Sequence, residues 1–148
     1  MGNYSYKFEK ILGLKENEKH DAQARYGEAV KAFEIAAEEL YRLLKKKEDL
    51  HALQQEKLVS GLSVSEIRHN QLFADNLENL ISYSQQTVMK ARENMNIWQN
   101  RLIEKNMEVK KYEKMKEKDF KKFKDHVKAI EKIEMDDVSI QTFLSKEN

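Results

Sequence analysis

Residues 60–66, which read Ser60-Gly61-Leu62-Ser63-Val64-Ser65-Glu66, are the stretch that decides the fold of this 148-residue chain. Gly61 suits the left-handed backbone conformation that commonly ends a helix. Ser63, followed three residues later by Glu66, matches the capping box that begins one. The stretch therefore predicts a turn at residues 59–64 that joins two helices.

The composition favours long helices on both sides of this turn. The chain contains no proline and only four glycines, so residues that interrupt helices are scarce. Charged residues make up 36% of the chain and aromatic residues 9%, which suits a narrow seam between helices better than a thick globular core. We expect one elongated domain, 1–148, with a first helix over 5–58, a second over 65–134 and a tail at 138–148.

The helix before the turn carries an apolar stripe whose members alternate in steps of four and three residues, as in a coiled coil. Its members are Tyr26, Val30, Phe33, Ala37, Leu40 and Leu44. After Leu44 the same steps fall on Lys47 and His51. The pattern therefore predicts that the seam shifts before this helix ends.

The helix after the turn carries a matching stripe. It runs through Phe73, Leu77, Leu80, Ser84, Val88, Ala91, Met95, Trp98, Leu102, Lys105, Val109 and Tyr112. Two consecutive four-residue steps around Ser84 predict a local unwinding of the supercoil. The two stripes coincide if opposed residue numbers add to about 124. The predicted fold is all-α, a long antiparallel two-helix coiled coil, or α-hairpin, with unequal arms.

In this pairing the second helix continues past the start of the first. Its apolar residues there are Phe120, Phe123, Val127 and Ile130, and they lie beside Tyr4, Phe8 and Ile11. Beyond Phe120 the helix has no partner within the chain, although one side of it stays apolar. We expect another protein to cover that side.

The residues that carry enzymatic chemistry are missing from the sequence or scattered along it. There is no cysteine, and the four histidines have no co-ligands at the spacing of a zinc site. The glycines stand too far apart for a phosphate-binding loop. Because a two-helix structure offers no dry cleft for acid–base chemistry, we expect a non-enzymatic protein without metal or cofactor.

Charge is nearly balanced over the whole chain but not in one part of the second helix. The chain has 27 lysines and arginines against 26 acidic residues. Residues 105–128 contain ten lysines and five acidic residues, a local excess of five positive charges. Such a stretch could face an acidic protein or a nucleic acid, but a solvated helix face explains it better, because it lacks arginine and carries interleaved acidic residues. A nucleic-acid-binding helix therefore remains an alternative, as does an unrelated coiled-coil adaptor or tether.

The cellular location is expected to be the cytoplasm. The absence of cysteine is compatible with a reducing compartment, and the sequence shows neither a secretory signal nor a stretch of about 20 apolar residues that could cross a bilayer. Contact with a membrane would then be peripheral.

Several segments, taken in order, resemble the flagellar FliJ proteins of the bacterial type III export apparatus, particularly the Gram-positive members. The segments are Tyr6-Lys7-Phe8-Glu9-Lys10-Ile11-Leu12, Leu14-Lys15-Glu16-Asn17-Glu18, Gln71-Leu72-Phe73 with Leu77-Glu78, Glu104-Lys105-Asn106-Met107-Glu108-Val109-Lys110-Lys111 and Glu134-Met135-Asp136-Asp137. Their order, the position of the hairpin and the total length all agree with that family.

The resemblance implies a small cytoplasmic helper that links the export ATPase ring to the membrane export gate and assists export chaperones and their substrates. The implied partners are the export ATPase and its regulator, the gate protein and the chaperones, with no nucleic acid, and with the membrane reached only through partners. The family's gate-contacting stripe falls on Phe73, Leu77, Leu80 and Ser84, where some relatives have a histidine in place of Ser84. The joined termini would enter the ring, with contacts by Tyr4, Phe8, Ile11, Phe120, Phe123, Val127 and Ile130. The first three gate residues also fit the predicted seam, so both interpretations stay open.

Overall fold

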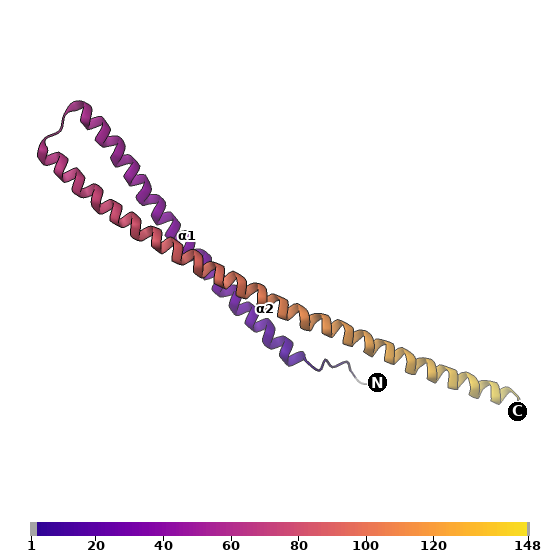
Figure 1. Ribbon diagram of the computed structural model, residues 1–148. Helices are drawn as coiled ribbons and strands as arrows, with labels where there is room; N and C mark the ends of the chain where they lie inside the picture. The colour runs from indigo at the N-terminus through magenta and orange to yellow at the C-terminus, as the bar shows by residue number, and fades with distance from the viewer. Residues whose placement is uncertain (1–2, 148) are drawn as a thin grey trace. The chain divides into compact units, whose positions relative to one another are not determined.

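Two long α-helices make up nearly all of the computed structural model, which describes residues 3–147 (Figure 1). Helix α1 spans Glu9–Ser60 and α2 spans Val64–Glu147, with lengths of 52 and 84 residues. Residues 3–147 contain no β-strand. The prediction of an all-α antiparallel hairpin with unequal arms is confirmed.

The turn between the helices uses the residues that the sequence indicated. Gly61 has a φ of 91°, a conformation that glycine adopts without steric cost. The Glu66 backbone N–H donates to the Ser63 hydroxyl over 3.2 Å, and the Ser63 N–H donates to the Glu66 carboxylate over 3.4 Å. These reciprocal bonds form the predicted capping box and begin α2 at Val64.

The outer ends of both helices differ from the prediction. Helix α1 begins at Glu9 rather than at residue 5, because residues 6–9 form a turn in which the Glu9 N–H donates to the Tyr6 carbonyl over 3.2 Å. Helix α2 continues through Asp136 and Asp137 to Glu147, so the predicted tail is helical as far as the structure describes it, and Asn148 lies outside that range. Aspartate inside a helix costs less than about 1 kcal/mol, too little to end it without a glycine or proline.

The chain divides into two compact units by its internal contacts. We call residues 21–103 the hairpin unit, and residues 3–20 with 104–147 the terminal unit. Each helix contributes to both units, and each unit is described by itself.

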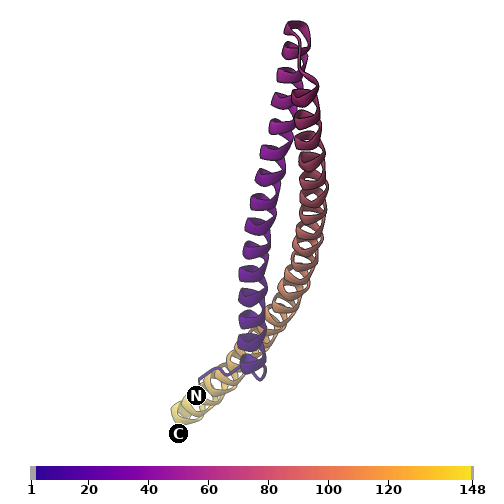
Figure 2. The ribbon, with the colours of Figure 1, turned by 90° about the vertical axis from the view of Figure 1, so that its left-hand side faces the viewer.

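In the hairpin unit, α1 and α2 pack side by side and run in opposite directions (Figure 2). The first helix buries one small or apolar residue in every seven. These residues are Ala22, Ala29, Ala36 and Leu43. The predicted stripe contained the adjacent residues Val30, Ala37 and Leu44 instead. Leu43 is 5% exposed and Leu44 43% exposed. Leu50, seven residues after Leu43, packs against the cluster that contains Leu43, so the seam keeps its seven-residue repeat. The predicted shift of the seam after Leu44 is therefore wrong.

In the second helix of the hairpin unit too, the residue that enters the seam is one position away from the predicted one. Ile81 is 4% exposed and packs with Leu77 and Leu43, whereas Leu80 is 54% exposed. With Ile81 in the seam, the steps from Leu77 to Ser84 are four and three. The predicted unwinding around Ser84 therefore has no basis, because the seam follows an unbroken heptad pattern there.

The predicted register is confirmed by contacts across the seam of the hairpin unit. Lys47 forms an ion pair with Glu78. The Arg25 guanidinium lies 5.2 Å from the centre of the Trp98 ring, and that of Arg92 lies 5.6 Å from the centre of the Phe33 ring. In each pair the residue numbers add to within two of the predicted 124.

The core of the terminal unit joins the start of the chain to the middle of α2. Tyr6, Leu12 and Val109 are buried, and Tyr4, Phe8 and Tyr112 pack against them. Because Tyr6 precedes α1, part of this core comes from a non-helical segment. These residues before α1 also form part of the candidate binding site.

Candidate protein-binding site at the chain termini

The first described residues, 3–8, form an N-terminal strap that precedes α1 and lies against α2. The Tyr4 hydroxyl donates to the Asp119 carboxylate over 2.9 Å and approaches the Lys116 carbonyl oxygen at 3.5 Å. The Tyr6 hydroxyl donates to the Tyr112 carbonyl oxygen over 3.1 Å. These bonds hold the non-helical strap against α2, since both tyrosine hydroxyls find a partner on that helix.

Aromatic rings continue the contact between the strap and α2. The centre of the Tyr4 ring lies 5.0 Å from that of Phe120 and 5.3 Å from that of Phe123. The Phe8 ring contacts Tyr112 in an edge-on arrangement with 6.3 Å between ring centres. The contact of Tyr4 with Phe120 agrees with the predicted pairing. The contact with Phe123 lies past it, so the prediction that the helix beyond Phe120 has no partner within the chain is wrong at Phe123. Phe120 remains 40% exposed.

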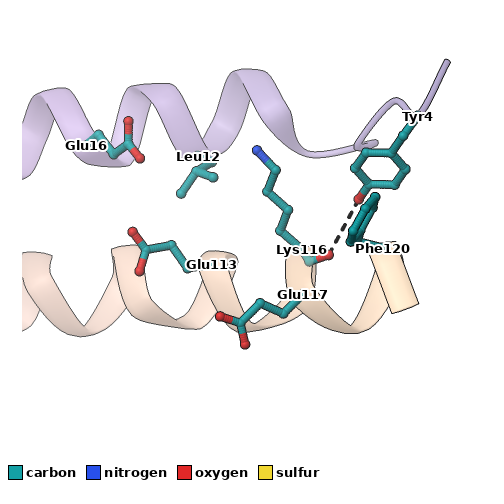
Figure 3. Close-up of a pocket in the computed structure, with 7 residues that line it drawn as sticks. All are labelled: Tyr4, Leu12, Glu16, Glu113, Lys116, Glu117 and Phe120. Carbon is teal, nitrogen blue, oxygen red and sulfur yellow. Dashed lines mark hydrogen bonds between the residues drawn. The ribbon is translucent and has the colours of Figure 1, made fainter. Parts of the chain in front are cut away.

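A groove of about 510 Å³ runs beside the strap (Figure 3). Its lining residues are Tyr4, Leu12, Glu16, Glu113, Lys116, Glu117 and Phe120. In Figure 3, Tyr4 and Phe120 lie together at one end, and the carboxylates come from both helices. The groove thus combines three apolar or aromatic side chains with three carboxylates and one lysine, a surface suited to side chains of another protein.

Past the strap, α2 carries further apolar side chains. Val127 and Ile130 are half-buried, whereas Ile133, Ile140 and Leu144 are 60%, 57% and 54% exposed. The predicted second helix, 65–134, contains Ile133 but ends before Ile140 and Leu144. The steps of seven and four residues from Ile133 to Leu144 were the available signal. Helix α2 extends beyond the strap in Figure 1.

A network of four charged residues crosses the seam of the terminal unit. Lys105 Nζ lies 3.1 Å from Glu18, and Lys15 Nζ lies 3.4 Å from Glu108 and 3.5 Å from Glu18. The hydrogen bond from Lys105 lowers the pKa of Glu18, and that bond raises the pKa of Lys105. The sequence placed Lys105 in the seam, but only the structure shows which carboxylates neutralise it.

The four residues of the implied gate stripe, all in the hairpin unit, separate into two pairs. Leu77 and Ser84 are buried, at 4% and 6% exposure. Phe73 and Leu80 are 51% and 54% exposed and lie seven residues apart on one side of α2. Two members of the stripe therefore belong to the seam, and two are accessible to another protein.

Residues 3–147 show neither a metal site nor a membrane-spanning segment. No group of three or more histidine, cysteine or acidic residues there is arranged to hold a metal ion. Neither helix, within the same residues, contains an apolar segment of the length that crosses a bilayer.

Comparison with known proteins agrees with this architecture. The family model described as "Flagellar FliJ protein" matches residues 4–148. The "Flagellar FliJ protein" of Bacillus subtilis (strain 168) is 49% identical over 141 residues, which cover 95% of this chain and 96% of that protein. No solved structure matches. The chain therefore belongs to the flagellar FliJ family, and its role is related to flagellar protein export.

Proposed function

We propose that this protein is a non-enzymatic link between the flagellar export ATPase ring and the membrane export gate. It acts in the cytoplasm, without a cofactor, and is peripheral to the membrane through its partners. The observation that carries this proposal is the aromatic and aliphatic surface at the joined chain termini. We call this surface the terminal face, and it consists of Tyr4, Phe8, Ile11, Phe120, Phe123, Val127 and Ile130.

The terminal face is the proposed contact with the ATPase ring. Exposed apolar surface rimmed by charged residues is typical of protein–protein contacts. Phe120 and Ile11 are 40% and 38% exposed, so they can reach a partner without unfolding of the hairpin. Val127 and Ile130 continue the apolar surface along α2 past the strap.

Binding to the purified export ATPase of the same bacterium tests this contact. Val127→Glu combined with Ile130→Glu places two charges on the terminal face and should abolish binding measured by calorimetry. Met135→Glu is the matched control, since Met135 is 71% exposed and lies on another side of α2. Circular dichroism should show unchanged helicity in both variants. Full binding by the double variant would reject the terminal face as the contact.

Phe73 and Leu80 are the proposed contact with the gate protein. Their exposure allows direct contact, and the buried Leu77 and Ser84 act by holding α2 against α1. Phe73→Glu with Leu80→Glu should prevent binding to the cytoplasmic domain of the gate protein and leave ATPase binding intact. Leu72→Glu, at a position 60% exposed on a different side of the helix, serves as the control.

The regulator of the ATPase and the export chaperones are the remaining proposed partners. Two separate contact surfaces, one in each unit, suit a protein that brings such partners together. If the wild-type protein binds neither the ATPase nor the gate protein, the proposal fails and a general coiled-coil tether becomes the better description. Failure of one contact alone would limit the role to the other partner.

A further inference from the structure

A groove lined by lysine and methionine lies on the outer side of α2 in the terminal unit. Its volume is about 460 Å³, and we call its residues the lysine–methionine face: Met107, Lys110, Lys111, Lys114, Met115 and Lys118. All six side chains are exposed, including Met107 at 65%. Their steps of three and four residues place them on one side of the helix, away from the seam residues Val109 and Tyr112.

Between residues 107 and 120 of α2, the acidic side chains and the lysines other than Lys116, which pairs with Glu9, occupy different sides of the helix. The four acidic residues between 107 and 120 are engaged or directed elsewhere. Glu108 pairs with Lys15 and Lys105, and Asp119 accepts a hydrogen bond from Tyr4. Glu113 and Glu117 line the groove beside the strap. Within residues 3–147, the four lysines of the face take part in no ion pair, so their charges are available to a partner.

We infer that the lysine–methionine face binds an acidic helical segment of a partner protein. Carboxylates repeated at three and four residues along such a segment would match the spacing of the lysines. The two methionines lie eight residues apart, about 12 Å along the helix, and their flexible side chains adapt to apolar residues of the segment. This surface shares no residue with the terminal face or the gate stripe, so it adds a third contact to the proposed function.

The composition of the lysine–methionine face favours an acidic protein segment over a nucleic acid or an anionic membrane. Sequence-tolerant nucleic-acid binding relies on arginine and aromatic side chains that stack on bases, and the face has neither. A helix that lies in a membrane surface inserts large apolar side chains, whereas this face offers only two methionines among four lysines. Charge complementarity with a modest apolar component is characteristic of helix-in-groove recognition between proteins.

A synthetic acidic amphipathic peptide provides the test. The peptide has about 20 residues, glutamates repeating along one helical side, and two leucines eight residues apart on that side. We expect the peptide to bind the full-length wild-type protein. Its affinity should fall roughly tenfold or more in the triple variant Lys111→Glu/Lys114→Glu/Lys118→Glu, and the wild-type affinity should fall steeply with added salt. Met107→Ser with Met115→Ser should weaken binding at least about threefold while all lysines remain.

Matched controls separate the face from net charge. Lys45→Glu/Lys46→Glu/Lys57→Glu changes the total charge equally at exposed positions of α1 and should bind as the wild type does. A scrambled peptide of the same composition should bind much more weakly. The inference is overturned if the acidic peptide does not bind, or if the methionine variant binds normally. It is also overturned if single-stranded DNA or vesicles of equal parts phosphatidylglycerol and phosphatidylcholine bind more tightly than the peptide.

Discussion

The Tyr4 hydroxyl donates a hydrogen bond to the Asp119 carboxylate over 2.9 Å, although 115 positions separate the two residues in the sequence. This bond, together with the packing of Tyr4 on Phe120 and Phe123, holds the N-terminal strap against α2. The strap therefore contributes Tyr4 and Phe8 to the terminal face, which we propose as the ATPase contact, and covers part of Phe120 and Phe123. The strength of this bond and packing decides how much of the terminal face a partner can reach.

Tyr4→Phe should release the strap without disturbing the helices. The phenyl ring remains, but the bond to Asp119 is lost, so the backbone amides of residues 3–8 should exchange with deuterium faster. Tyr83→Phe is the control, since Tyr83 is 72% exposed. Equal exchange in the wild type and Tyr4→Phe would show that the hydroxyl does not hold the strap.

The strap should also open at high pH. Burial and the neighbouring Asp119 raise the pKa of Tyr4 from 10.0 to about 12. The folded strap thus favours the protonated phenol, and its stabilisation is complete below pH 10 and lost as the pH rises toward 12. Burial also raises the pKa of Tyr6, so ultraviolet titration should show late ionisation of two tyrosines, of which the Tyr4 part is missing in Tyr4→Phe. Persistence of that part in the variant would assign it to another tyrosine.

Glu18→Gln should destabilise the terminal unit near neutral pH by a few degrees in melting temperature. The hydrogen bond from Lys105 lowers the pKa of Glu18 below its usual 4.5. Its stabilisation is therefore present above pH 4.5 and lost as the pH falls through the lowered value, where wild type and variant should converge. Glu34→Gln, at an exposed position of α1, is the control for thermal melts followed by circular dichroism. A difference that persists in acid would exclude this ionic cause.

Leu77→Ala and Leu80→Ala should differ strongly despite their closeness in sequence. Leu77 is 4% exposed, and removal of its side chain should lower the free energy of unfolding by about 2–5 kcal/mol. Leu80 is 54% exposed, and its replacement should cost less than about 0.5–1 kcal/mol. Urea denaturation of the full-length variants measures both values. Similar losses would mean that Leu80, rather than Ile81, occupies the seam.

Glycine-to-alanine replacements should have opposite effects at two positions. Gly61→Ala imposes a side chain on a residue with a φ of 91° and should cost about 1–2 kcal/mol. Gly27 lies inside α1, and an added Cβ would meet no atom within 4 Å, so Gly27→Ala should stabilise the protein by about 0.5–1 kcal/mol. Comparison of the two denaturation curves decides whether the turn needs glycine. A stabilising Gly61→Ala would contradict the left-handed conformation.

The sequence by itself determined the fold class, the turn and the approximate register. Gly61 and the Ser63–Glu66 pair act over a few residues, so local chemistry specifies them without knowledge of the rest of the fold. The spacing of apolar residues over many turns likewise favours one antiparallel pairing. Such signals are readable because each depends only on neighbours in the chain.

Only the tertiary structure decided which member of each adjacent apolar pair enters the seam. Leu43 and Leu44, like Leu80 and Ile81, lie about 100° apart on their helices, so both fit a three- and four-residue spacing. The opposite helix selects Leu43 and Ile81, and so frees Leu80 for another contact. The conformation of the N-terminal strap could not be predicted from the sequence for a related reason. Its conformation comes from bonds to Tyr112 and Asp119, partners more than one hundred residues away, which no local pattern in residues 3–8 encodes.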